Sequence, residues 1–199
     1  MRKIKVLTFL SMDGILQGPG GPDEDASGNF KYCGWTAPYF DGFLGEIMSE
    51  QMKQPFNLLL GRTTYDIFAA HWPHHAEEWP GINESTKYVV SKQDLDLSWE
   101  NSVQLKGDFV TEIERLKSED GPDLYVYGSG QLAQALFQHD LIDELWLKIF
   151  PITLGTGKRL FDEGTLPARY ELKESSVSPK GVIVANYKRA GEVKTDTFL

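Results

Sequence analysis

Hydrophobic residues along the chain gather into short runs, and glycine-rich turns or segments with helical spacing separate these runs. Runs that are rich in β-branched and aromatic residues are typical of buried strands. They occupy residues 3–10, 56–60, 86–91, 103–105, 123–127 and 142–150. Two further runs, 169–177 and 182–189, flank Ser178-Pro179-Lys180-Gly181 and predict a closing hairpin.

Segments with helical periodicity lie between these strands. Apolar residues from Phe40 to Met48 recur at intervals of three and one, which predicts a helix over 38–54 that ends before Pro55. Further helices are expected at 65–70, 109–118 and 131–138. Because strands alternate with helices before the hairpin, we expect an α/β fold with a mixed, mostly parallel central sheet flanked by helices. The 199 residues fit a single domain, 1–199.

Composition narrows the function classes. The formal net charge of −9 argues against a protein that wraps nucleic acid or coats anionic lipid. Cys33 is the single cysteine, which excludes an internal disulfide framework and a multi-cysteine zinc site. We find no signal-peptide pattern and no stretch near the roughly 20 apolar residues of a membrane span. We therefore expect a cytoplasmic protein without a nucleic-acid or membrane partner.

The first of two glycine turns follows the strand 56–60. Gly61 allows close approach of a ligand to the backbone, and Arg62 offers a planar fork of donors that suits a phosphate. Thr63 or Thr64 can cap the following helix or bind a phosphate oxygen. An ordinary capped helix with a surface arginine is the alternative interpretation.

The second glycine turn, 128–133, follows the strand 123–127 and fits the pattern G-x-G-x-x-A before a helix. Such a turn also occurs as a plain strand–helix connection. Because the carboxyl ends of parallel strands meet at one edge of a sheet, the two turns predict a common phosphate site. Arg62 and Lys92 favour a 2′-phosphorylated dinucleotide.

Ordered motifs along the whole chain resemble the dihydrofolate reductase superfamily, and in particular the reductase domain of bacterial riboflavin biosynthesis, the C-terminal half of a bifunctional deaminase-reductase. These motifs are Ser11-Met12-Asp13-Gly14, Gly61-Arg62-Thr63-Thr64-Tyr65, Val90-Ser91-Lys92, Gly128-Ser129-Gly130-Gln131-Leu132 and the segment 151–157. Each motif is short, and the specificity comes from the ordered set. No deaminase zinc motif is present, so the resemblance extends to the reductase half alone.

The resemblance implies an eight-stranded mixed sheet with NADPH bound across the strand ends. The implied cofactor-binding residues are Gly61, Arg62, Thr63, Thr64, Ser91, Lys92, Gly128, Ser129, Gly130, Gln131 and Leu132. Folate reductases also carry an acidic residue on the helix before the first glycine turn, where it grips the pterin. This chain offers Asp41 and Glu46 there, and neither matches that spacing to Gly61.

The substrate side is less defined by the sequence. The resemblance implies that Asp13 lies near the nicotinamide and the substrate, although Asp-Gly is also a common turn. Trp35 and Phe40 can stack on a planar heterocycle or belong to the core, and Thr156 can meet an anionic group or lie in a charged turn. The histidines of 71–75 have no metal-ligand spacing, so no metal site is expected.

Together these features predict an NADPH-dependent reductase of a pyrimidine- or pteridine-like heterocycle. The named activity implied by the resemblance is reduction of 5-amino-6-(5-phosphoribosylamino)uracil. The alternative is a non-catalytic nucleotide-binding or sensor module that keeps the pocket. The strand 142–150 has Leu145 and Leu147 on one face and Trp146 on the other, and we expect this strand to bury a surface in a homodimer.

Overall fold

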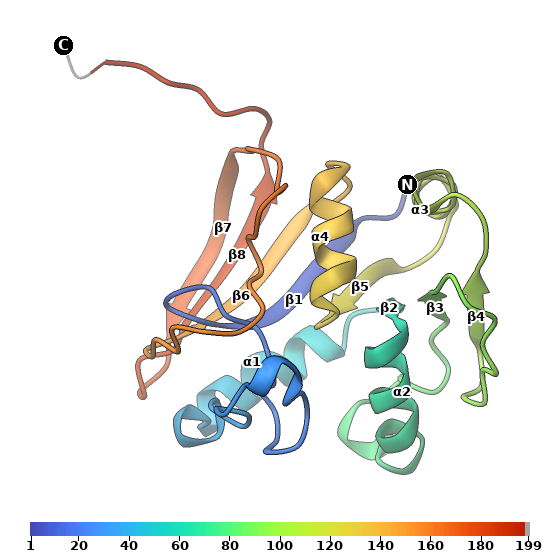
Figure 1. The fold of residues 1–199 in the computed structure, drawn as a ribbon, viewed down its shortest axis with the longest axis horizontal. Coiled ribbons are helices and arrows are strands. Elements are labelled where there is room, and N and C mark those ends of the chain that lie inside the picture. The colour runs from blue at the N-terminus through green and yellow to red at the C-terminus, as the bar shows by residue number, and fades with distance from the viewer. Residues whose placement is uncertain (198–199) are drawn as a thin grey trace.

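A single eight-stranded sheet forms the centre of the computed structural model, which describes residues 1–197 (Figure 1). The strands are β1 (Ile4–Ser11), β2 (Phe56–Gly61), β3 (Lys87–Val90), β4 (Ser102–Leu105), β5 (Asp123–Tyr127), β6 (Glu144–Phe150), β7 (Tyr170–Val177) and β8 (Ile183–Arg189). Their order is β4-β3-β2-β5-β1-β6-β8-β7. Pairing is parallel from β4 to β6, whereas β8 pairs antiparallel with β6 and β7. The predicted mixed, mostly parallel sheet with a closing hairpin is confirmed.

Helices cover both faces of this sheet. They are α1 (Gly42–Met52), α2 (Arg62–His71), α3 (Phe109–Ser118) and α4 (Gly130–Gln138). The helices α3 and α4 bury Ile113 and Leu136 against one face, which includes Val6. On the other face, α2 packs its Tyr65 in the cluster that contains Leu60, and α1 packs against the end of β6. Figure 1 shows α4 lying across the middle of the sheet, with β7 and β4 at opposite edges.

The helix predicted over 38–54 is shorter in the structure. A separate 3-10 turn occupies Ala37–Tyr39, and α1 begins at Gly42 because the Asp41 side chain accepts a hydrogen bond from the Leu44 N–H at 2.9 Å. The helix ends at Met52, since a proline at 55 disfavours helical geometry in the residues just before it. Periodicity located the buried face of this helix correctly and its first residue wrongly.

The helix expected at 65–70 begins earlier, at Arg62, directly after β2. Gly61 occupies the N-cap position and no side chain caps this helix. Thr63 and Thr64 therefore lie within the first turn, and the proposed capping role of these threonines is wrong.

The strand β6 is internal, because it pairs with β1 on one side and β8 on the other. Leu145 and Leu147 are buried in the core beneath α4, and Trp146 packs against the cluster on the opposite face. Leu145 and Leu147 are thus covered within the chain, whereas Trp146 is only partly buried. The homodimer itself stays a prediction. Within residues 1–197, no helix has both the length and the apolar character needed to cross a bilayer.

Candidate functional site

A large cavity lies where the parallel strands reach their carboxyl ends. Its volume is about 1330 Å³, and its walls include Gly61, Val90, Leu105 and Tyr127 from the ends of β2, β3, β4 and β5. This volume exceeds the range of roughly 300–1,000 Å³ that is usual for small-molecule sites, so the cavity has room for a ligand of dinucleotide size. All residues predicted to bind the cofactor line it, namely Gly61, Arg62, Thr63, Thr64, Ser91, Lys92, Gly128, Ser129, Gly130, Gln131 and Leu132.

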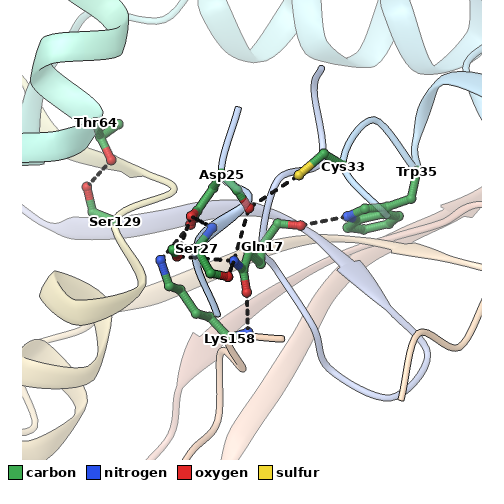
Figure 2. Close-up of polar contacts among 8 residues, drawn as sticks. All are labelled: Gln17, Asp25, Ser27, Cys33, Trp35, Thr64, Ser129 and Lys158. Atoms are coloured by element: carbon green, nitrogen blue, oxygen red, sulfur yellow. Dashed lines mark hydrogen bonds and ion pairs between the residues drawn. The ribbon is translucent and has the colours of Figure 1, made fainter. Parts of the chain in front are cut away.

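The two glycine turns are joined by the Ser129 hydroxyl (Figure 2). Ser129 Oγ accepts from the Gly61 N–H at 3.0 Å and donates to Thr64 Oγ1 at 2.7 Å. A Cβ atom at Gly61 would lie 3.3 Å from this hydroxyl, which explains why the position suits glycine. The adjacency follows from the sheet, because β2 and β5 are parallel neighbours. The turns thus form one surface, as their sequences predicted.

Two consecutive residues of the second glycine turn have positive φ angles. Gly128 and Ser129 both have left-handed geometry, with φ of 55° and 54°. Glycine adopts this conformation without steric cost, whereas a serine does so only when its surroundings hold it. Its two hydrogen bonds to the first turn provide that constraint.

The helices differ in whether a side chain accepts a hydrogen bond from the free N–H groups of the first turn. Asp41 caps α1, and the Asp108 carboxylate accepts from the Thr111 N–H of α3 at 3.0 Å. In contrast, α2 and α4 have no side-chain cap and no acidic residue in the first turn. The first residues of both helices, 62–64 and 130–132, line the same cavity. Such paired helix ends suit a diphosphate.

Cationic side chains lie at the β3 end of the cavity. Arg62 is half-exposed, its Nη1 donates to Gln93 Oε1, and its Nε lies 3.6 Å from a carboxylate oxygen of Asp66. Ser91 Oγ donates to the Gln93 carbonyl at 3.1 Å, which places the end of β3 beside Arg62. Lys92 is exposed at the same place. These cations suit a phosphate group that lies beyond the diphosphate.

The buried side chain of Gln17 holds together the loop over residues 17–27, part of which lines the cavity. Gln17 Nε2 donates to the carbonyls of Asp25 and Ser27 at 3.0 and 2.9 Å, and its Oε1 accepts from the Lys158 N–H at 3.0 Å (Figure 2). Lys158 Nζ pairs with the Asp25 carboxylate at 2.6 Å. Burial opposes ionisation of Asp25, but the hydrogen bonds from Lys158 and Ser27 outweigh it and lower the pKa. Sequence reasoning missed this network, because its members lie far apart along the chain.

Asp13 does not face the cavity. Its carboxylate accepts from the Ser11 hydroxyl at 2.6 Å and from the N–H groups of Leu154 and Gly155 at 3.1 and 2.7 Å. Partial burial favours the neutral acid, but these hydrogen bonds together lower the Asp13 pKa to about 2. The carboxylate therefore anchors the loop after β1 to the loop after β6, and we do not retain Asp13 as the polar group at the substrate.

The expected substrate-binding residues also lie outside the cavity lining. Trp35 is buried, donates from Nε1 to the Gln17 carbonyl at 2.8 Å and packs edge-on against Phe150. Phe40 packs edge-on at the rim of the same core, and Thr156 is exposed in a turn. The core alternative holds for Trp35 and the turn alternative for Thr156, whereas Phe40 is 39% exposed and belongs neither to the core nor to the cavity lining. Within residues 1–197, no group of three or more His, Cys, Asp and Glu side chains is arranged to hold a metal ion.

Lys148 and Gln51 form a polar pair that sequence reasoning missed. Lys148 Nζ donates to Gln51 Oε1 at 2.5 Å, and both side chains line the cavity. The lysine is 2% exposed, and its burial lowers its pKa to about 7. Its signal in the sequence is a lone charge within the apolar strand LWLKIF.

The chain matches the family model described as the RibD C-terminal domain over residues 2–184. Two curated relatives come from Bacillus subtilis (strain 168), and both are described as uncharacterized. YyaP is 23% identical over 192 residues, which cover 94% of this chain and 94% of YyaP. YwjB is 27% identical over 175 residues, which cover 86% of this chain and 90% of YwjB.

Solved structures share the fold. A putative riboflavin biosynthesis protein from Shewanella sp. PV-4 matches with a TM-score of 0.66 and 24% identity, over 96% of this chain and 99% of that one. A pyrimidine reductase-like protein from Corynebacterium diphtheriae matches with a TM-score of 0.60 and 15% identity, over 96% and 93%. Dihydrofolate reductase from Enterococcus faecalis, solved in complex with NADP(H) and RAB-propyl, matches with a TM-score of 0.59 and 13% identity, over 94% of this chain and 96% of that one.

Proposed function

The chain belongs to the RibD C-terminal domain family, and from this premise we propose that it is an NADPH-dependent reductase of a pyrimidine- or pteridine-like heterocycle. The activity that it most resembles is 5-amino-6-(5-phosphoribosylamino)uracil reductase of riboflavin biosynthesis. The observation that carries the proposal is the pair of uncapped helix starts that meet at Ser129 in one cavity.

The residues of the cavity fit NADPH. The N–H groups at the starts of α2 and α4 are suited to the diphosphate, since no carboxylate side chain occupies either helix start. Arg62 and Lys92 are suited to the 2′-phosphate, because both line the β3 end of the same cavity, where the third cation, Lys106, is paired with Asp94. The dihydrofolate reductase structure that shares the fold was solved with NADP(H), which supports this choice of cofactor.

The remaining wall of the cavity is suited to a planar ring. When bound, NADPH supplies the hydride, so the protein has to hold the acceptor ring and exclude water. Phe9 and Met48 give this wall its apolar character, and Lys148 with Gln51 gives it polar groups. The loop held by Gln17 covers the cavity from the opposite side.

Binding and turnover can be tested separately. We expect NADPH to bind with a change in its fluorescence, and we expect its absorbance at about 340 nm to fall when the correct heterocycle is added. Candidate substrates are pyrimidinediones with ribityl or ribosyl substituents and oxidised pteridines. Tight binding of NADPH without oxidation by any of these compounds would favour the non-catalytic module, and absence of NADPH binding would contradict both functions.

A further inference from the structure

Lys148 is a buried cation with unused hydrogen-bonding capacity. An ammonium group has three N–H donors, and Gln51 Oε1 is the single acceptor that it contacts within residues 1–197. The side chain lines the cavity although the residue is 2% exposed. Burying an ammonium group without a counter-charge is costly, which lowers the Lys148 pKa to about 7, and a ligand oxygen that accepts its free N–H donors would offset part of this cost.

No carboxylate balances this charge among the described residues. Burial is the single cause of the lowered Lys148 pKa, which means that no acidic side chain is close enough to raise it. The acidic residues of the cavity wall are engaged elsewhere: Glu24 with the Gly20 and Gly21 N–H groups, Asp25 with Lys158, Asp94 with Lys106, Asp108 with Thr111, and Glu112 with Arg115.

The neighbouring helix contributes no acid either. Toward the cavity, α1 presents Met48, Gln51 and Met52. Asp41 caps the start of this helix, and Glu46 and Glu50 are exposed and lie outside the cavity lining. A carboxylate on this helix would bind the N–H donors of an aminopyrimidine or pterin. The wall instead carries Gln51 from α1 and Lys148 from β6, which offer N–H donors to a ligand that has carbonyl oxygens.

We propose that Lys148 is the substrate-recognition residue of this wall and that it binds a ring carbonyl oxygen of the heterocycle, with Gln51 holding its ammonium group in place. The proposal rests on the proposed function for the position of the ring beside the cofactor. A pyrimidinedione supplies the acceptor that Lys148 lacks. A basic 2,4-diaminopyrimidine supplies donors and positive charge, and Lys148 repels it.

A matched pair of probes tests this recognition directly. 5-Aminouracil and 2,4,5-triaminopyrimidine share a ring and a 5-amino group, and they differ in carrying oxygen or amino groups at two carbons. We would measure their dissociation constants by ligand-observed NMR, with and without NADPH. We expect the wild-type protein to bind 5-aminouracil at least tenfold more tightly, a ratio in keeping with hydrogen bonds to a charged group.

Two variants weaken the proposed contact between Lys148 and the ring carbonyl oxygen in different ways. Lys148→Met removes the charge and keeps the length of the side chain, whereas Gln51→Glu keeps the lysine and gives it an internal counter-charge. Each is expected to weaken 5-aminouracil binding about tenfold. Gln51→Glu in the Lys148→Met background should bind the triaminopyrimidine more tightly than wild type does. Lys173→Met, which removes an exposed cation of β7 outside the cavity lining, should leave 5-aminouracil binding unchanged.

Each outcome decides the proposal. It is overturned if the wild-type protein binds neither probe or prefers the triaminopyrimidine, or if the preference for 5-aminouracil survives in both single variants. Melting temperatures of the variants identify any that fail to fold, and Gln51→Glu then carries the test because it retains Lys148. Failure of NADPH to bind counts against the proposed function alone, since the probes are also measured without it.

Discussion

The two sides of the cavity offer a ligand different kinds of chemical group. At the glycine turns, the groups that face a ligand are backbone N–H groups and helix ends, and a single hydroxyl, Ser129 Oγ, ties them together. At the α1 wall, the polar groups are two side chains, Lys148 and Gln51, from elements far apart in the sequence. Under the proposed function, the backbone groups bind the diphosphate and the two side chains select the ring. The comparison therefore separates the proposed cofactor binding from the proposed substrate choice.

The largest expected effect comes from placing a negative charge at an uncapped helix start. Thr63 is exposed in the first turn of α2 and lines the cavity. Thr63→Asp should weaken NADPH binding about a hundredfold, since like charges a few ångströms apart repel by several kcal/mol at about ε = 20. The same change should keep or slightly raise the melting temperature, because an acid favours a helix start. Isothermal titration and thermal melting measure the two effects.

Gly42→Asp is the matched control, since it adds an acid to the first turn of α1, outside the cavity lining. It should leave NADPH affinity unchanged. Equal losses of affinity in both variants would mean that net charge, rather than the α2 start, governs binding.

Arg62→Ala tests whether Arg62 accounts for a preference for NADPH over NADH. If Arg62 binds the 2′-phosphate, its loss should weaken NADPH binding about tenfold or more and leave NADH binding unchanged. Parallel fluorescence titrations with the two cofactors measure the change in preference. Arg115→Ala, which removes an arginine of α3 that lies outside the cavity lining, should alter neither affinity. Equal effects on NADPH and NADH in Arg62→Ala would remove the 2′-phosphate assignment.

Ser129→Ala tests the link between the two glycine turns. The hydroxyl serves the Gly61 N–H and Thr64, so its removal should destabilise the fold by about 1–2 kcal/mol and weaken NADPH binding severalfold. Urea unfolding measures the free energy of unfolding. Ser118→Ala removes an exposed hydroxyl that bonds one carbonyl, and it should have little effect. If Ser129→Ala behaves like this control, the turns are held by other contacts.

The smallest effect concerns a loop that we place outside the site. The Asp13 pKa falls from 3.8 to about 2 on folding, because hydrogen bonds stabilise the carboxylate. A lowered pKa contributes stability above the unfolded value, and this stability is lost as the pH falls through the folded value. Asp13→Asn should therefore melt at a lower temperature at neutral pH, with the difference from wild type narrowing between about pH 4 and 2. A constant difference across that range would contradict the anchoring role of the carboxylate.

The sequence predicted the sheet well because its strands carry unambiguous apolar runs. The helix α3 and the strand β5 have the expected bounds, 109–118 and 123–127. The start of α1 was misplaced because Phe40 continues the helical spacing beyond the cap at Asp41. Periodicity reports which side of a segment is buried, whereas capping by a single side chain decides where the helix begins.

The glycine-turn side of the cavity, where we propose that the cofactor binds, could be predicted because its residues form contiguous motifs at strand ends. The wall formed by α1 and β6 could not, because it depends on which side chains of these two elements face each other. Trp35 illustrates the difficulty, since a large aromatic side chain near a cleft packs against Phe150 instead of facing the cavity. Lys148 carried a visible signal, a charge within an apolar strand, but the sequence did not show that this position faces a cavity.

The most direct test of the account is a titration of the isotope-labelled protein with NADPH, followed through backbone amide NMR signals. If the two uncapped helix starts share the diphosphate, the amides of residues 61–64 and 128–132 should shift together with one dissociation constant. The amides at the capped start of α1, which lies outside the cavity lining, should stay in place. Shifts confined to one of the two turns, or found mainly at the start of α1, would contradict a shared diphosphate site.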